Sequence, residues 1–201
     1  MDSTDEAMRT LSTNNNDGFT LSELLIVVVL ISILSGVAIS SFSQRWAQER
    51  LLAAARETHT WLENQRLIAM KAGQACEISI NASTATLDPS AEQVSLADGN
   101  TLNNSCKGQA PLAIRDAVNN GGGISLSTSD PDTTGIRFSF RGLSEIITAS
   151  PDAHHQQVLV LKLNHPDSKK QRCIKLMSPL GIIRSGWSDA NASSCQFSNS
   201  F

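Results

Sequence analysis

The sequence has 201 residues, of which 40% are hydrophobic, and its formal net charge is −3. This length is enough for one apolar anchor and one compact domain of ordinary size. The total charge gives no indication of nucleic-acid binding by the chain as a whole. The charge is unevenly distributed, because residues 154–187 hold six bases and one acid, whereas residues 73–153 hold nine acids and four bases.

The first informative element is a long apolar stretch that begins shortly after a glycine. The sequence Gly18-Phe19-Thr20-Leu21-Ser22-Glu23 runs directly into a series of leucine, isoleucine and valine residues. Glu23 is the only charged residue between Gly18 and Gln44. A carboxylate without a partner is costly in apolar surroundings, so we expect Glu23 to meet a cation.

Two ordinary kinds of segment compete for this stretch. A secretory signal peptide has its cleavage site after the apolar region, whereas the recognisable glycine of this chain, Gly18, comes before it. A plain membrane anchor needs roughly 20 mostly apolar residues, and residues 24–42 come close to that length. An anchor alone does not need the Gly-Phe-Thr-Leu-x-Glu pattern that precedes it. On either interpretation we expect the stretch to enter a membrane.

These residues resemble the N-terminus of type IV pilins and of the pseudopilins of type II secretion. The resemblance implies that residues 1–18 are a prepilin leader peptide, which a prepilin peptidase removes by cutting between Gly18 and Phe19. It also implies that the new terminal residue, Phe19, is N-methylated. Glu23 would then serve assembly by meeting the charged N-terminus of a neighbouring subunit.

From Phe19 to about Ala72 we expect one continuous helix. The segment contains no proline, and beyond Gln44 small or apolar residues recur at helical spacing: Ala47, Leu51, Ala54, Thr58, Trp61, Ile68 and Ala72. Two helices broken near Gly36 or at Ser40-Ser41 are the alternative.

A continuous helix of this size would be about 80 Å long, far more than a bilayer requires. We therefore expect residues 19–42 to form a transmembrane helix that becomes the filament core. Residues 43–73 would form an amphipathic continuation of this helix, covered by later parts of the chain.

Beyond Gly73 the helical period stops, and short β-branched or alternating runs begin. Turn-forming residues separate these runs. The segment of residues 83–123 is polar and poorly patterned, so we expect it to be mostly loop. The predicted strands are Cys76–Ile80, Ile124–Leu126, Ile136–Phe140, Gln157–Leu163 and Arg172–Leu176, and a tight turn at Ser178–Gly181 leads into Ile182–Arg184.

The predicted fold class is α+β, with the long N-terminal helix packed against an antiparallel β-sheet head. Residues 74–201 would form this β-rich globular head. Its strands would pack on the helix face that carries Leu51, Trp61 and Ile68.

Four cysteines, Cys76, Cys106, Cys173 and Cys195, all follow the apolar stretch. An even number in a domain that resembles a translocated one indicates two disulfides formed in an oxidising compartment. Three pairings are open, and we favour Cys76 with Cys106 and Cys173 with Cys195, because each closes a short loop. The spacing does not suggest a zinc site.

Three later runs resemble the FimT/FimU minor pilins and the GspH pseudopilins. They are residues 65–73, residues 135–142 and residues 172–184. The resemblance implies the type IV pilin fold and a structural subunit of a type IV pilus, with a pseudopilin of a type II secretion system as the alternative. The implied partners are other pilins, the prepilin peptidase and the bacterial inner membrane, with the head in the periplasm.

A basic cluster near the C-terminus suggests a second function. Its members lie in or beside two strands joined by the tight turn, and we expect several to share one face: Lys169, Lys170, Arg172, Lys175 and Arg184, with Lys162 nearby. Such a face can neutralise DNA phosphates. Some FimT-like pilins are associated with DNA uptake through C-terminal arginines, and Arg184 is the nearest match. The alternative is a solvated charged edge that prevents aggregation.

The sequence gives little support for an enzyme. His154, His155 and His165 lie in or beside predicted loops, without the spaced carboxylates of a metal or nucleophile site. Asp130-Pro131-Asp132 lacks the series of oxygen ligands that a calcium site requires. We therefore predict no catalytic residues, no cofactor, no metal and no small-molecule substrate.

Overall fold

The computed structural model describes residues 18–95, 100–114, 123–149, 157–190 and 192–197, with the side chains of residues 36–42 and 95 left out of the description. The chain divides into two compact units, Met1–Ser41 and Phe42–Phe201. The predicted leader, residues 1–18, lies outside the described residues except for Gly18. The second unit is called the head below.

A single helix, α1, is assigned from Leu21 to Ala72, in agreement with the predicted continuous helix. The helix ends where Gly73 takes a positive φ of 66°. The Gln74 N–H donates to the Ala69 carbonyl over 3.3 Å, the bond expected when a glycine terminates a helix in the left-handed conformation.

The buried stripe of α1 differs in part from the predicted one. The prediction holds from Ala47 through Thr58, and the stripe then continues through Leu62, Gln65 and Ala69. Trp61 and Ile68 are only partly buried at the edge of the core, and Ala72 is exposed. The polar Gln65, only 1% exposed, occupies a core position, which is why the apolar pattern pointed to the neighbouring stripe.

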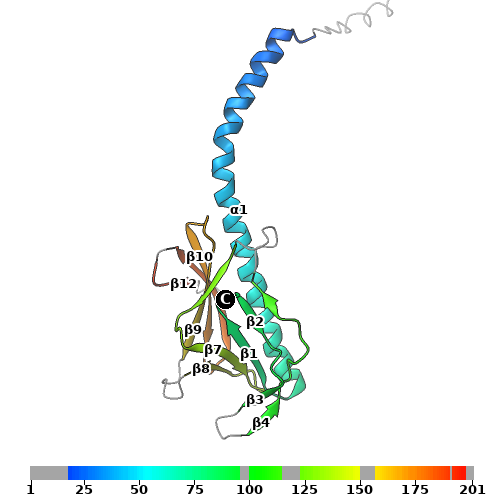
Figure 1. Ribbon diagram of the computed structural model, residues 1–201, viewed down its shortest axis with the longest axis vertical. Coiled ribbons are helices and arrows are strands. Elements are labelled where there is room, and N and C mark those ends of the chain that lie inside the picture. The colour runs from blue at the N-terminus through cyan, green and yellow to red at the C-terminus, as the bar shows by residue number, and fades with distance from the viewer. Residues whose placement is uncertain (1–17, 96–99, 115–122, 150–156, 191, 198–201) are drawn as a thin grey trace, which may run out of the picture. The chain divides into compact units, whose positions relative to one another are not determined.

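Within its described residues, the head contains two five-stranded antiparallel sheets and a small ribbon, and their strands are labelled in Figure 1. The first sheet has the order β5 (Leu112–Ala113), β2 (Thr86–Asp88), β1 (Cys76–Asn81), β7 (Thr133–Phe138) and β8 (Ser144–Thr148). The second sheet has the order β12 (Gln196–Phe197), β11 (Ile182–Asp189), β10 (Lys170–Met177), β9 (Val158–Asn164) and β6 (Ser125–Thr128). The ribbon pairs β3 (Gln93–Ser95) with β4 (Thr101–Asn103).

The α+β class with antiparallel pairing is confirmed, with differences in detail. Two sheets replace the single predicted sheet. The described part of residues 83–123 is mostly loop, as predicted, but it also contains the four short strands β2, β3, β4 and β5. The strands β8 and β12 were not predicted.

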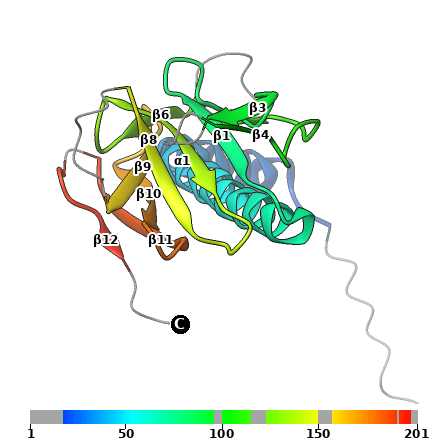
Figure 2. The ribbon, with the colours of Figure 1, turned by 90° about the horizontal axis from the view of Figure 1, so that it is seen from below.

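The core of the head forms where α1 meets both sheets. Figure 2 shows the green strands of the first sheet and the orange strands of the second sheet on different sides of the helix. Fully buried side chains come from all three layers: Leu51 and Leu62 of α1, Ile78, Ile136 and Phe138 of the first sheet, and Leu161, Ile174 and Leu176 of the second. Burying each such side chain contributes about 2 kcal/mol.

Two turns meet α1 at one point, which joins the two sheets. Arg66 Nε donates to the Gly142 carbonyl over 2.9 Å. A Cβ added to Gly181 would lie 2.3 Å from the same Gly142 oxygen and 3.2 Å from Arg66 Nε. The Ser144 N–H donates to the Pro179 carbonyl over 2.9 Å, and Ser178 Oγ donates to the Ser144 carbonyl over 2.8 Å. The β7–β8 turn and the β10–β11 turn are thus fastened to each other and to the helix.

Candidate functional site

The predicted cleavage residues are accessible. Phe19 is 86% exposed, and a Cβ added to Gly18 would meet no atom within 4 Å. Both residues precede the helix, which begins at Leu21. A peptidase would therefore meet an uncovered, non-helical peptide at this position.

Glu23 has a local role that the sequence analysis missed. Its Oε2 accepts hydrogen bonds from the Thr20 backbone N–H over 2.9 Å and from Thr20 Oγ1 over 3.0 Å. In return, the Glu23 N–H donates to Thr20 Oγ1 over 3.3 Å. This reciprocal arrangement is a capping box, which satisfies two N–H groups at a helix start. The signal was present in the sequence as Thr20-x-x-Glu23.

The helix that follows is covered with exposed apolar side chains. From Leu21 to Leu34 the large apolar side chains are between 48% and 84% exposed. The two serines in this segment satisfy their hydroxyls internally, because Ser32 Oγ donates to Val28 O and Ser35 Oγ to Ile31 O, both over 2.7 Å. A helix that is apolar all round requires burial against other apolar material.

Within the part of the chain that the structure describes, no helix is long and apolar enough to cross a membrane. Residues 36–42 of the predicted span lie outside the residues whose side chains are described. The transmembrane assignment of residues 19–42 therefore remains a prediction.

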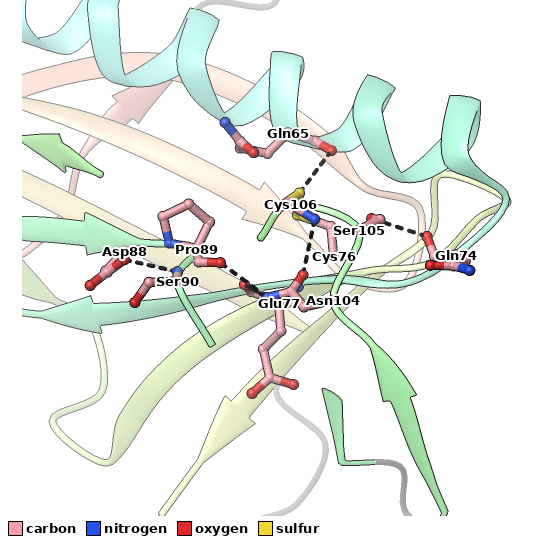
Figure 3. Close-up of a disulfide and its surroundings, with 10 residues drawn as sticks. All are labelled: Gln65, Gln74, Cys76, Glu77, Asp88, Pro89, Ser90, Asn104, Ser105 and Cys106. Carbon is pink, nitrogen blue, oxygen red and sulfur yellow. Dashed lines mark hydrogen bonds between the residues drawn. A yellow bond between two sulfur atoms is a disulfide. The ribbon is translucent and has the colours of Figure 1, made fainter. Parts of the chain in front are cut away.

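The first disulfide joins Cys76 at the start of β1 to Cys106 (Figure 3). Both cysteines are fully buried, and Cys106 Sγ lies 3.8 Å from the Gln65 carbonyl of α1. The bond therefore fastens the irregular segment after β4 beneath the helix. This is the pairing favoured from the sequence.

Asn104 completes this region in a way that the sequence did not indicate (Figure 3). Its Oδ1 accepts from the Glu77 N–H over 3.0 Å and from the Cys106 N–H over 3.2 Å. Its Nδ2 donates to the carbonyls of Glu77 over 2.9 Å and Pro89 over 3.2 Å. The buried amide thus replaces a strand backbone as the partner of Glu77 and fixes three segments around the disulfide.

The second disulfide joins Cys173 of β10 to Cys195. It holds residues 192–195 against the outer side of the second sheet, the side away from the core, before residues 196–197 join the edge of that sheet as β12. There Gln171 Nε2 donates to Ala192 O over 2.9 Å, and Lys162 Nζ donates to Ser193 O over 3.0 Å. A Cβ on Gly186 would lie 2.6 Å from the Phe197 ring, so only glycine fits beneath this aromatic side chain.

The five predicted DNA-contacting residues do not share one face. Lys175 lies directly opposite Arg184 in the β10–β11 register, and both point to the outer side. Side chains alternate along a strand, so Arg172 and Lys170 lie on the core-facing side of β10, the side that also carries Ile174 and Leu176. Lys169 immediately precedes β10. The structure therefore splits the basic cluster into an outer pair and a group at one end of the sheet.

Of the residues considered for metal binding, His165, Asp130 and Asp132 are described by the structure. His154 and His155 lie outside the described residues. Across the described part of the chain, no group of three His, Cys, Asp or Glu side chains is placed to hold a metal ion. Asp130 Oδ1 instead accepts from the Asp132 N–H over 3.0 Å, which shapes the turn before β7.

Comparisons with known proteins find the prokaryotic N-terminal methylation motif at residues 13–39. No curated protein matches the sequence. Among solved structures, the chain is similar to the minor pseudopilin EpsH from the type 2 secretion system of Vibrio cholerae. The identity is 13% and the TM-score is 0.43, over 71% of this chain and 99% of that chain.

The methylation motif covers the residues that hold the accessible Gly18-Phe19 peptide, the capping box and the apolar helix. The same helix element continues into a head of antiparallel sheets. This chain therefore has a type IV pilin-like N-terminus, marked by the prokaryotic N-terminal methylation motif.

Proposed function

We propose that this protein is a minor pilin or pseudopilin that assembles into a type IV pilus through its N-terminal helix. A prepilin peptidase cuts between Gly18 and Phe19, and Phe19 is then N-methylated. The observation that carries the proposal is the exposed apolar surface of residues 21–34 within a methylation motif. Such a surface requires either lipid or the same helices of neighbouring subunits.

Residues 19–42 anchor the chain in the bacterial inner membrane before assembly, with the head in the periplasm. Two observations support this placement. The serine hydroxyls at Ser32 and Ser35 bond to backbone carbonyls, as polar groups in lipid must. The two disulfides of the head suit an oxidising compartment.

Glu23 sets the axial offset between neighbouring subunits. In apolar surroundings its carboxylate attracts the charged N-terminus of an adjacent subunit strongly, whereas in water the same pair would contribute little. The capping box does not prevent this role, since a carboxylate has lone pairs for further donors. The charge thus selects one register, because only that register supplies both groups with partners.

The finer assignment lies between a FimT/FimU-like minor pilin and a GspH-like pseudopilin of type II secretion. The runs that carry this resemblance contribute Arg66, Gly142 and Gly181, which meet at one junction in the head. Deletion of the chain separates the two assignments. Loss of pili supports the pilus, and loss of protein secretion with intact pili supports the secretion system.

DNA uptake is a second candidate function, and the outer pair favours it. Lys175 and Arg184 lie directly opposite each other, and like charges in that position destabilise a sheet. Lys162 of β9 lies on the same side of the sheet. A phosphate would therefore meet three positive charges on this side. Binding of duplex DNA that weakens steeply with salt, and is lost in Lys175→Glu/Arg184→Glu, would support this function.

Mass spectrometry of the protein from its native membrane tests the main proposal. The expected chain begins at Phe19 and carries one additional methyl group on its N-terminal amine. Replacing Gly18 with a bulky residue should retain the leader. A native chain that begins at Met1 would contradict the proposal.

A further inference from the structure

The core-facing side of the second sheet changes character towards one end. Leu176 and Ile174 are buried in the core, and the next two residues on that side of β10 are Arg172 and Lys170. Arg172 lies opposite Trp187 of β11. Lys170 Nζ lies 4.8 Å from the centre of the Trp187 ring, and Trp187 is 38% exposed. At this end the second sheet therefore extends beyond the apolar core, and the side chains that it carries there are cationic or aromatic.

Contacts with α1 show which end this is. The Gly181 turn lies beside Arg66, and the Ile183 carbonyl is 3.4 Å from His59 Nε2. β11 therefore runs from the end of α1 towards its start. Trp187 lies about 13 Å further along β11 than Ile183, which is the length of about nine helical residues. Trp187 is therefore at the level of the helix residues about nine positions before His59. In Figure 1 the orange turn that precedes β10 lies at this same end of the head.

The residues of α1 at the level of Trp187 are also basic and aromatic. Trp46 is 54% exposed and lies between Arg45 and Arg50. We call the combined set the basic rim, and its members are Arg45, Trp46, Arg50, Lys169, Lys170, Arg172 and Trp187. The rim has five bases. Three acids are near them: Glu49 and Asp167 in the sequence, and Asp189 opposite Lys170 in the strand register. The rim is therefore positively charged.

Tryptophan with lysine and arginine is the composition that favours a membrane–water interface, and basic side chains are attracted to anionic headgroups. Trp46 follows the end of the proposed anchor, residue 42, by about one helical turn. We propose that the basic rim docks on the anionic lipid surface and holds the head against the membrane before assembly. This inference rests on the proposed anchoring of residues 19–42.

Tryptophan fluorescence in reconstituted bilayers tests the docking. The full chain with Trp46→Phe and Trp61→Phe retains Trp187 as its single tryptophan, since the sequence has three. It is reconstituted into vesicles of phosphatidylcholine alone or of an equal mixture with phosphatidylglycerol, each with a phosphatidylcholine spin-labelled on its headgroup. We expect strong quenching of Trp187 in the anionic vesicles and little in the neutral ones. Added salt should reverse the quenching, because it screens the attraction.

Matched charge reversals identify the surface. Lys169→Glu/Lys170→Glu/Arg172→Glu should reduce quenching to the level of neutral vesicles. Lys162→Glu/Lys175→Glu/Arg184→Glu, with the same change in charge on the outer side, should leave it unchanged. The salt titration needs no charge reversal in the rim, so a folding defect in the reversals does not decide the result.

The outcomes separate this inference from the proposed function. If the chain fails to float with either vesicle, the anchoring is wrong and the docking with it. If it floats with both but Trp187 is quenched equally or not at all, only the docking is wrong. Retention of duplex DNA by Lys169, Lys170 and Arg172 without lipid quenching would assign the rim to nucleic acid and overturn the lipid proposal.

Discussion

Arg66 donates a hydrogen bond of 2.9 Å from Nε to the carbonyl oxygen of Gly142, which ties the last turns of α1 to the β7–β8 turn. The two residues are far apart in the sequence and belong to different runs of the family resemblance. Because the β10–β11 turn packs on the same oxygen, this one contact coordinates the helix and both sheets.

Removing this contact should weaken the whole head. Arg66→Ala deletes a charged donor to a partly buried carbonyl, which should lower the free energy of unfolding by about 2 kcal/mol. Urea unfolding of the full chain in detergent would measure the change. Arg56→Ala, at an exposed position earlier on the helix, is the matched control and should change stability little. Equal effects of the two substitutions would contradict the role of the junction.

Gly181 should tolerate no side chain. It has a positive φ of 67°, and an added Cβ would lie 2.3 Å from the Gly142 oxygen. Gly108 has a positive φ of 88°, but nothing lies within 4 Å of its added Cβ. Gly108→Ala should therefore cost about 1 kcal/mol of backbone strain, and Gly181→Ala about 3 kcal/mol of strain and overpacking. Urea midpoints of the two variants provide the comparison.

Asn104 should contribute more to stability than its neighbour Asn103. Asn104→Ala leaves several buried backbone groups without partners, which should lower the free energy of unfolding by about 3 kcal/mol. Asn103→Ala changes an exposed residue of β4 and should be nearly neutral. Hydrogen exchange at the Glu77 and Cys106 amides should increase only in the Asn104 variant. Unchanged protection of these amides would contradict the proposed bonds.

The second disulfide should stabilise the head by restricting the unfolded chain. Its sequence separation is 22 residues, so Cys173→Ser/Cys195→Ser should lower stability by about 3 kcal/mol. The same variant should release residues 192–197, which increased proteolysis near the C-terminus would show. Proteolysis at the wild-type rate would mean that the hydrogen bonds of Gln171 and Lys162 suffice to hold the segment.

The two roles of residue 23 can be separated experimentally. Glutamine preserves the capping box but removes the charge, whereas Thr20→Ala removes the capping hydroxyl and keeps the charge. We expect Glu23→Gln and Glu23→Ala to be cleaved normally but to enter filaments poorly. Thr20→Ala should be incorporated. Immunoblots of sheared filaments and of membranes would show both steps, and efficient incorporation of Glu23→Gln would contradict the charge-based role.

Much of the fold follows from local patterns. Long alternating runs such as Val158–Asn164 predict strands directly. The strands β2 to β5 have only two or three residues each, too few for an alternation to be visible. The segment that follows β4 is held by the Cys76–Cys106 bond and by Asn104, which are contacts between distant parts of the chain.

The candidate site was predicted less completely, for identifiable reasons. The prediction that several basic residues share one face did not say which, because it did not use strand parity. Arg172 and Lys175 are three residues apart and must lie on opposite sides of β10, and the side that Lys175 shares with Lys162 and Arg184 emerges only from the register. The capping box at Thr20 was visible but was not considered. The proximity of Trp187 to Lys170 required the β10–β11 register, which the tight turn at Gly181 only suggested.

The positions of the two disulfides along the chain impose an order on maturation. Both cysteines of the first bond, Cys76 and Cys106, are synthesised well before Cys173 and Cys195. The helix-side crosslink can close while the second sheet is still missing its central strands. The crosslink to Cys195 can close only after the strands β1 to β11 have been synthesised, so its presence marks a head in which the central strands of both sheets are in place.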